Sequence, residues 1–340
     1  MTSSRAKLVF VDDSLPGITR RRAGTGWAYF DATGQKISDP AERQRLNAIA
    51  LPPAYVDAWY CPADNGHILA TGYDAKGRKQ YRYHPDFRAE RESHKFDGCV
   101  TFGSLLPLVR QRVESDLAGR HATRERAVAG VVRLLDIGII RVGNEQYAKS
   151  NKSFGATTLR QRHAKVSGTS LRLRCKGKSG VVRDLQLSDR RLAKVVRSMQ
   201  DLPGQNLFQF LDDSGFAQPV TSSDVNAYLA ETMGEAITAK SFRTWHASAM
   251  GYGLLARSSE KLTVKELTTA IAHELGNTPT VCRKSYIHPA VMSLIDTQED
   301  FRASLRLPRA TRWLTREERG LIELLQDAGS SHALIAAAAA

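Results

Sequence analysis

Apolar residues follow two different spacings along this chain, and the spacing changes near residue 95. Upstream of that point, short apolar runs lie between clusters of turn residues, which is the pattern of strands in a small β-sheet. These runs predict strands at residues 26–30, 56–60 and 67–73. A short helix is expected at 39–49, because Asp39 and Pro40 form a helix start. Residues 1–95 are therefore expected to form a β-rich N-terminal domain.

From Thr101 onward, apolar residues recur every three or four positions, which is the period of an amphipathic helix. Only residues 163–187 break this period, because two alternating segments flank a Gly-Lys-Ser-Gly turn and predict a β-hairpin or three-stranded insertion. The helical pattern is clearest at residues 105–113, 128–135, 144–150, 192–199, 224–233, 240–250, 263–275 and 312–325. The expected fold class is α+β, with a mainly helical C-terminal domain over residues 96–340.

One stretch of this helical region, residues 263–289, carries unusually clear start and stop signals. Thr263 and Glu266 form a capping box, and Gly276 ends the first predicted helix. Thr278 and Pro279 then start a short second helix, which is expected to run until Pro289 and to carry Tyr286. This arrangement places Asn277 in the turn between the two helices. A tyrosine with its usual pKa of about 10 is a poor nucleophile, so a catalytic role for Tyr286 would need cations from elsewhere.

The net charge of the chain says more about its binding partner than its overall composition does. At 340 residues, with 42% hydrophobic and 25% charged positions, the composition is that of an ordinary globular protein. Its formal net charge of +14 attracts polyanions, so nucleic acid is the expected partner. A ribosome-associated protein, a protein on an anionic membrane and a basic enzyme are the alternatives. We expect a cytoplasmic location, because neither a signal peptide nor a run of eighteen apolar residues occurs.

Two partial motifs argue against nucleotide and metal cofactors. Gly177, Lys178 and Ser179 match the end of a phosphate-binding loop, but Arg172 stands where that loop requires a glycine. His273 and Glu274 begin a zinc-protease motif, but Asn277 occupies the place of its second histidine. The four cysteines form no C-x-x-C pair, which also disfavours zinc. We expect neither ATP nor an obligatory metal.

Residues 72–84 interleave cations, amides and aromatic rings, which suits a surface that lies on DNA. If the segment is a strand, the side chains of Tyr81 and Tyr83 share one face. The candidate DNA-binding residues are Lys76, Arg78, Lys79, Gln80, Tyr81 and Tyr83. A solvated basic hairpin with two core tyrosines explains the same pattern equally well.

The helical region adds cations that are far apart in sequence. Arg141 follows a predicted helix in a turn, Lys178 lies at the hairpin tip, and Lys240 and Arg243 share one face of a helix start. Each alone has an ordinary structural explanation. Together with Asn277 and Tyr286 they resemble the active site of the type IB DNA topoisomerases, in particular the small viral and bacterial members. The motifs that carry this resemblance are residues 72–81, 140–143 with 145–147, 177–178, 240–244, 275–279 and 284–286.

The resemblance implies a C-shaped clamp around duplex DNA and a transesterification cycle. Tyr286 would attack a backbone phosphorus and form a 3′-phosphotyrosyl bond, and strand rotation and religation would then relax supercoils without ATP. Arg141 and Arg243 would stabilise charge on the phosphate, and Lys178 would protonate the leaving 5′-oxygen. Asn277 stands where many relatives carry histidine and would donate a hydrogen bond only, while Lys240 would bind DNA. The resemblance also implies a monomer associated with the nucleoid, acting preferably on supercoiled DNA.

Two other functions remain open at this point. Tyrosine recombinases and integrases share the Arg, Lys, Arg and Tyr chemistry. However, they usually carry histidine where Lys240 stands, and they grip DNA with a helical domain instead of a β-rich one. A basic DNA-binding protein without catalysis is the second alternative, and for it the Tyr286→Phe substitution would change nothing.

Overall fold

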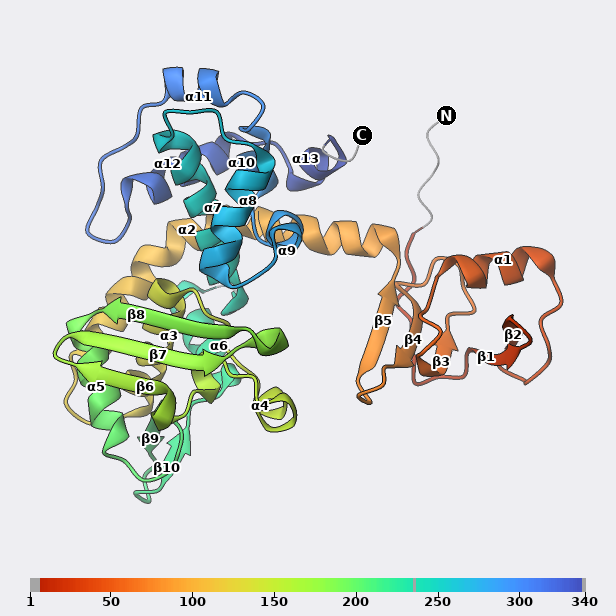
Figure 1. The fold of residues 1–340 in the computed structure, drawn as a ribbon, viewed down its shortest axis with the longest axis horizontal. Helices are drawn as coiled ribbons and strands as arrows, with labels where there is room; N and C mark the ends of the chain where they lie inside the picture. The colour runs from red at the N-terminus through yellow and green to blue at the C-terminus, as the bar shows by residue number, and fades with distance from the viewer. Residues whose placement is uncertain (1–6, 235–236, 338–340) are drawn as a thin grey trace. The chain divides into compact units, whose positions relative to one another are not determined.

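The structure is a computed structural model, and it describes residues 7–234 and 237–337. The chain divides into two compact units, Met1–Glu92 and Ser93–Ala340. Figure 1 gives the element labels that are used below.

The first unit is built on a five-stranded antiparallel sheet with strand order β2-β1-β3-β4-β5. Asp39 caps α1 by accepting hydrogen bonds from the amides of Ala41 and Glu42, as its sequence predicts. A small core of Ile18, Tyr29, Leu46, Leu51, Ala58, Tyr60 and Ala70 fills the space beneath the sheet and α1. The elements are β1 Ile18–Ala23, β2 Gly26–Phe30, α1 Pro40–Ala48, β3 Val56–Tyr60, β4 Ile68–Tyr73 and β5 Lys79–Tyr83.

Strand β1 was not predicted, because its sequence, ITRRRA, has three consecutive arginines and no clear alternation. One of them, Arg20, packs its guanidinium 4.0 Å from the centre of the Trp27 ring. The same group donates hydrogen bonds to the carbonyls of Leu51, Pro52 and Tyr55. Arg20 therefore links β1 to the loop after α1, at a position where the pattern of a buried strand would lead one to expect an apolar residue.

The first long helix, α2 Pro85–Leu117, begins sixteen residues before Thr101, so the predicted start is wrong. Its early buried positions include Ser93 and Cys99 beside Phe96, and these small polar side chains hide the helical period from an apolar pattern. Farther along, Gly103 is required by packing, because a Cβ there would lie 2.2 Å from the Trp245 ring. The glycine lets the largest buried side chain of the chain sit directly against α2.

The second unit contains helices around one large core and a three-stranded antiparallel sheet, β6-β7-β8. The sheet lies where the insertion was predicted, and Figure 1 shows its three strands side by side. A short two-stranded sheet, β9 with β10, was not predicted. The elements up to this point are α3 Arg124–Gly138, α4 Glu145–Asn151, β6 Ala164–Ser167, β7 Ser170–Lys176, β8 Val182–Ser188, α5 Arg190–Gln200, β9 Gln209–Leu211, β10 Ala217–Pro219 and α6 Ser222–Met233, with 3-10 turns at Ala156–Thr158, Gln161–His163 and Lys178–Gly180.

Helix α7 Lys240–Arg257 lies at the centre of the remaining helices and packs against α8, α10, α11 and α12. Its side chains Phe242, Trp245 and Ala249 are all buried and form its packed side. The helices after it are α8 Val264–Leu275, α9 Pro279–Ser285, α10 Pro289–Ser293, α11 Gln298–Ser304, α12 Arg316–Asp327 and α13 Ser331–Ala337. The β-rich N-terminal region and the mainly helical C-terminal region with its sheet insertion confirm the predicted fold class. Among the described residues, no helix has the length and apolarity that a membrane crossing needs.

Candidate active site

Tyr286 lies one residue beyond the end of α9, where its amide donates a hydrogen bond to the Cys282 carbonyl at 3.0 Å. The prediction that it sits within this helix, and that Pro289 ends the helix, is wrong: Pro289 instead opens α10 after a His288 cap. The Ser248 hydroxyl of α7 donates to the Tyr286 carbonyl at 3.4 Å and accepts from the His288 amide at 2.9 Å. The segment that carries the tyrosine is thus anchored to the central helix.

Arg243 faces the phenol of Tyr286, with its guanidinium carbon 4.9 Å from the centre of the ring. Burial raises the pKa of this tyrosine, but the nearby cations Arg243, Arg141 and Lys240 outweigh it, and the pKa is lowered overall. The cations favour the phenolate, which is the nucleophilic form. The surroundings of Tyr286 therefore favour ionisation of its phenol.

The Arg243 side chain is only 3% exposed, although a charged group is costly to bury. Its two Nη atoms donate to the carbonyls of Ile139 and Leu275 at 2.6 and 3.0 Å. Its Nε atom is buried and has no partner among the described residues. Burial and the Arg141 charge both lower the pKa of Arg243. Lys240, one helical turn earlier, acts on the same tyrosine but is exposed.

Arg141 and Asn277 meet although 136 residues separate them, because the Arg141 Nη2 donates to the Asn277 Oδ1 at 2.5 Å. Helix α3 ends at Ile139 in the left-handed conformation, and an extended segment carries Arg141 away from it. The Asn277 Nδ2 is buried without a partner in the described part of the chain. The Cys282 thiol lies beside it, and burial raises the pKa of that thiol, so the sulfur is a weak acceptor. A free amide donor therefore remains next to Arg141.

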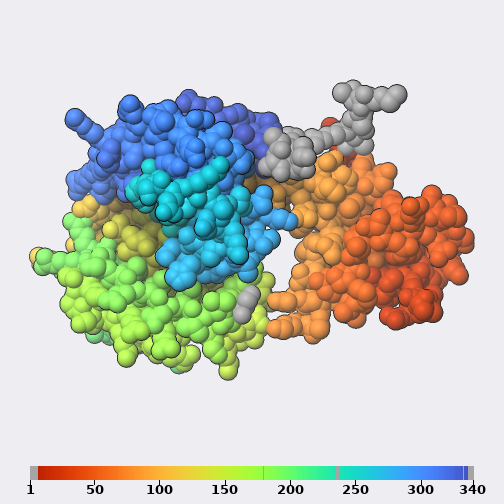
Figure 2. All heavy atoms as spheres, turned by 45° about the horizontal axis from the view of Figure 1, so that its top comes forward, coloured from red at the N-terminus to blue at the C-terminus, as the bar shows by residue number. Residues whose placement is uncertain are grey.

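Lys178 lies exposed in the 3-10 turn between β7 and β8, as predicted for a hairpin tip. It lines a small pocket together with Arg141 and Arg243, so the structure brings the three predicted cations to one place. Figure 2 shows the green residues of the sheet directly against the cyan and light-blue residues of α8 and α9. A fourth cation, Arg183 of β8, lines the same pocket and was missed in the sequence. Its alternating strand gave no signal that distinguished it from other surface arginines.

Comparison with known proteins decides the family. Residues 84–306 match the family described as "Eukaryotic DNA topoisomerase I, catalytic core", and residues 26–74 match "Bacterial DNA topoisomerase IB, N-terminal domain". The chain belongs to the type IB DNA topoisomerases. It is a DNA-binding isomerase of this family, which confirms the family and the enzyme class that the sequence motifs predicted.

Three individual proteins illustrate the range of similarity. DNA topoisomerase 1B of Acanthamoeba polyphaga mimivirus is 29% identical over 301 residues, covering 84% of this chain and 90% of the relative. DNA topoisomerase 1 of Mycosarcoma maydis is 26% identical over 251 residues, covering 67% of this chain and 24% of the relative. The solved XerH site-specific recombinase on palindromic difH substrate is 14% identical, with a TM-score of 0.37, covering 58% of this chain and 51% of its own. That score is too low to carry an argument for recombinase activity.

Six of the candidate DNA-binding residues of this topoisomerase lie on the β4–β5 hairpin of the first unit, while Lys240 begins α7 of the second. Tyr81 and Tyr83 share one face as predicted, with ring centres 5.7 Å apart and planes 9° apart. Tyr81 is 41% exposed and Tyr83 is half-buried, so the alternative of two core tyrosines is wrong.

Several polar residues of this hairpin already have partners within the unit. Asp74 accepts hydrogen bonds from Arg78 and from the Gln80 amide, and Arg78 holds the pKa of that carboxyl low, at about 2. Lys79 forms an ion pair with Asp13 at 2.6 Å. Lys76 is exposed in the turn. DNA contacts by Arg78, Lys79 and Gln80 would therefore have to compete with carboxylates, whereas Lys76 and Tyr81 are open.

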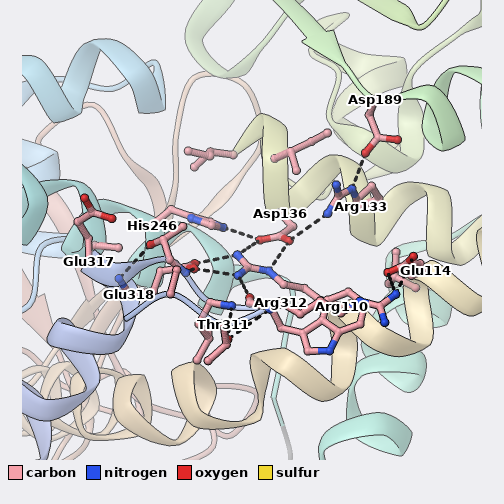
Figure 3. Close-up of a pocket in the computed structure, with 18 of the residues that line it drawn as sticks. Arg110, Glu114, Arg133, Asp136, Asp189, His246, Thr311, Arg312, Glu317 and Glu318 are labelled. Carbon is pink, nitrogen blue, oxygen red and sulfur yellow. Dashed lines mark hydrogen bonds and ion pairs between the residues drawn. The ribbon is translucent and has the colours of Figure 1, made fainter. Parts of the chain in front are cut away.

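A cavity of about 970 Å³ lies around Arg110 and Asp136 (Figure 3), and Tyr286 is not among its lining residues. Arg110 of α2 forms paired hydrogen bonds with Asp136 of α3 and with Glu318 of α12, at 2.7 to 3.0 Å. The His246 Nε2 of α7 also contacts Asp136, at its Oδ1, at 2.9 Å. These bonds join four helices, and the cavity therefore has a structural explanation. The described residues contain no cluster of histidine, cysteine, aspartate and glutamate that could hold a metal ion.

Proposed function

We propose that this chain relaxes supercoiled DNA by breaking and rejoining one strand through a covalent bond to Tyr286. The observation that carries the proposal is the contact between the Tyr286 ring and the buried Arg243 guanidinium, which also lowers the pKa of the phenol. The phenolate attacks a backbone phosphorus, forms a 3′-phosphotyrosyl bond and releases the 5′-oxygen. The free strand rotates about the intact one, and the returning 5′-hydroxyl displaces the tyrosine.

The other residues of the pocket supply what this exchange needs. Negative charge grows on the two non-bridging oxygens of the phosphate, and Arg141 and Arg243 offer guanidinium donors to them in a partly dry site. The Nε of Arg243 and the Nδ2 of Asn277 have no acceptor among the described residues, and a phosphate oxygen would provide one. Lys178 donates the proton that the leaving 5′-oxygen requires. Asn277 has no proton to exchange near neutral pH, so its role is limited to hydrogen bonding.

The remaining properties follow from this chemistry. The phosphotyrosyl ester keeps the energy of the broken phosphodiester, so we propose that the reaction uses neither ATP nor an obligatory metal. One chain carries all the proposed catalytic groups, and we propose that it acts as a monomer. Duplex DNA would be the substrate, with Lys76, Tyr81, Tyr83 and Lys240 among the residues that contact it. We further propose a cytoplasmic location on the nucleoid and a preference for supercoiled DNA.

The decisive experiment combines a nicked suicide substrate with the Tyr286→Phe variant. Wild-type protein should form a covalent adduct at the peptide containing Tyr286 and should relax a plasmid in EDTA without ATP. Tyr286→Phe should do neither. Tyr252→Phe is the matched control, since it removes a phenol from α7 whose ring packs on Phe301 away from the pocket, and it should behave as wild type.

The same experiment separates the competing functions. Activity that requires paired recombination sites and more than one protein molecule would indicate a recombinase. Absence of any adduct from wild-type protein would indicate a DNA-binding protein without catalysis. Either result would overturn the proposal.

A further inference from the structure

Arg183 connects two parts of the candidate active site. It is the second residue of β8 and pairs with Cys175 of β7, just below the turn that carries Lys178. Its side chain leaves the sheet and reaches the end of α8, immediately before Asn277. It lines the same pocket as Lys178, Arg141 and Arg243.

The contacts of Arg183 are those of a helix cap. Its Nη2 donates to the Glu274 carbonyl at 2.8 Å, and its Nη1 lies 3.5 Å from the His273 carbonyl. The last carbonyls of a helix have no partner within the helix and carry partial negative charge, so a cation there is favourable. This end of α8 is the point from which the chain turns into Asn277.

Gly276 is shaped to accept this arginine. It ends α8 in the left-handed conformation, with φ of 60°, which favours glycine. A Cβ at this position would lie 2.6 Å from the Arg183 Nη1 and 2.9 Å from its Cδ. The turn and the arginine are therefore packed against each other.

Two backbone hydrogen bonds also act close to the turn that carries Lys178. The Gly177 amide donates to the Val181 carbonyl at 2.8 Å, which closes the turn on itself. The Phe154 amide donates to the Lys176 carbonyl at 2.8 Å and fixes β7. Arg183 adds hydrogen bonds from β8 to the carbonyls at the end of α8, and these bonds link the hairpin to the helix that precedes Asn277.

We propose that Arg183 is a positioning residue: it ties the Lys178 hairpin to the end of α8 and thereby sets the ammonium of Lys178 at the leaving 5′-oxygen. This inference rests on the proposed function. A general acid must lie within hydrogen-bond reach of the oxygen that it protonates, and a displacement of about 1 Å can cost about a hundredfold in rate. Lys178 has a long flexible side chain, so the position of its ammonium group depends on the position of the backbone that carries it.

The step on which Arg183 acts can be isolated by the choice of leaving group. In the normal reaction the phosphorus–O5′ bond breaks, and Lys178 transfers its proton to that oxygen. If sulfur replaces the bridging 5′-oxygen, the strand leaves as a thiolate, which needs no proton because thiols ionise near pH ~8.5. A substitution that acts through Lys178 slows cleavage of the oxygen substrate and spares the sulfur substrate.

The test is single-turnover cleavage of both substrates by Arg183→Met, Lys178→Ala and the double variant, with protein in excess over DNA. We expect Arg183→Met to slow the oxygen substrate by about tenfold to a hundredfold and to leave the sulfur substrate near the wild-type rate. In the double variant the loss should not exceed that of Lys178→Ala, because the two residues serve one step. Arg183→Lys keeps a cation at the helix end and should recover part of the rate.

Arg172→Met is the matched control, since Arg172 is an exposed arginine of the same sheet that pairs with Asp184. It should cleave both substrates as wild type does. Equal slowing of both substrates by Arg183→Met, or additive losses in the double variant, would overturn the inference. If Arg183→Met does not fold, the same criteria apply to Arg183→Lys. Failure of the proposed function is a separate result, because wild-type protein would then form no adduct with either substrate.

Discussion

Two pockets of the second unit are lined by arginines, and they differ in what faces the guanidinium groups. In the large cavity of Figure 3, Arg110 faces Asp136 and Glu318, Arg133 faces Asp189, and Arg191 and Arg312 face Glu114. In the small pocket beside Tyr286, no carboxylate is among the lining residues. Its arginines donate to backbone carbonyls and to the Asn277 amide.

The difference shows where the protein accepts unfavourable electrostatics. Burial lowers the pKa of both Arg183 and Arg243, and repulsion from Arg141 lowers both further, while the nearby Glu274 charge acts against this lowering at Arg183. Such a cluster is costly in the free protein and becomes favourable when an anion enters. The size of a cavity is thus a poor guide to chemistry here, and the absence of neutralising carboxylates among its lining residues is a better one.

The strongest test of the comparison removes a carboxylate from the neutralised cavity. Asp136→Asn leaves a buried Arg110 facing one carboxylate instead of two, and we expect a loss of about 3 kcal/mol or more in the free energy of unfolding. Hydrogen bonds and charge from His246 and Arg110 hold the pKa of Asp136 far below its usual value despite complete burial. Its stabilisation is therefore present above the unfolded pKa of about 3.9 and is lost as the pH falls toward the folded value.

Urea unfolding of wild type and Asp136→Asn between pH 3 and pH 7 would measure this effect. The two proteins should differ most at pH 7 and converge toward pH 3. The rate of DNA cleavage, measured where both are folded, should change far less than stability does. A large loss of cleavage rate without loss of stability would contradict the structural assignment of this cavity.

For Arg141→Ala in the small pocket, we expect a large loss of cleavage rate without a loss of stability. Removing one donor to a charged transition state typically costs about a hundredfold to a thousandfold in rate. Stability should stay level or rise, because Arg141 repels Arg243 and Arg183 in the free protein. Single-turnover cleavage and thermal unfolding of the same preparation would measure both quantities. A clear loss of stability would remove the distinction between the two pockets.

A smaller effect is expected from Lys240→Ala, and it should appear in the pH profile. Lys240 is one of the cations that lower the pKa of Tyr286, so removing it should raise that pKa. The rising limb of the cleavage rate should therefore move to higher pH, by less than about one unit for an exposed charge. Single-turnover cleavage at saturating protein separates this shift from weaker DNA binding. Lys265→Ala, at another exposed lysine, is the control and should leave the profile in place.

The smallest change is expected from Asn277→His. Either side chain can donate a hydrogen bond to a phosphate oxygen, so the rate should stay within about threefold of wild type. The pH profile of the wild type should contain no contribution from this position. A new limb near pH 6.5 with a large gain in rate would show that the position serves acid–base chemistry, against the assignment made here.

Sequence reasoning found most elements of the fold because their signals are local. The capping box of Thr263 and Glu266 and the Gly276 stop bound α8 where they were predicted. The alternation that places Tyr81 and Tyr83 on one face is likewise a property of one strand. The errors concern the first part of α2, where the polar Ser93 is buried, and the arginine-rich β1, in which only Ile18 is buried.

The candidate site was predicted only in part, because its residues come from distant parts of the sequence and local signals do not connect them. Arg141, Lys178, Arg243 and Tyr286 were recognised through a family resemblance between separated motifs, and local spacing alone would not have joined them. Arg183 belongs to none of those motifs, and its partner Glu274 is 91 residues away. Pairing of Asp74 with Arg78 and Gln80 was also missed, because a basic hairpin gives no sign of which cations are already held.

The unpartnered donor atoms of Arg243 and Asn277 have a consequence for the choice of assay buffer. Small tetrahedral oxyanions such as sulfate and inorganic phosphate offer the oxygens that these atoms lack, and they can compete with the substrate for the pocket. Chloride carries a single charge and no oxygens, so we expect it to compete less than these oxyanions do. Rates measured in phosphate buffer would then describe a partly occupied enzyme, and choosing the counter-ion becomes part of choosing the assay.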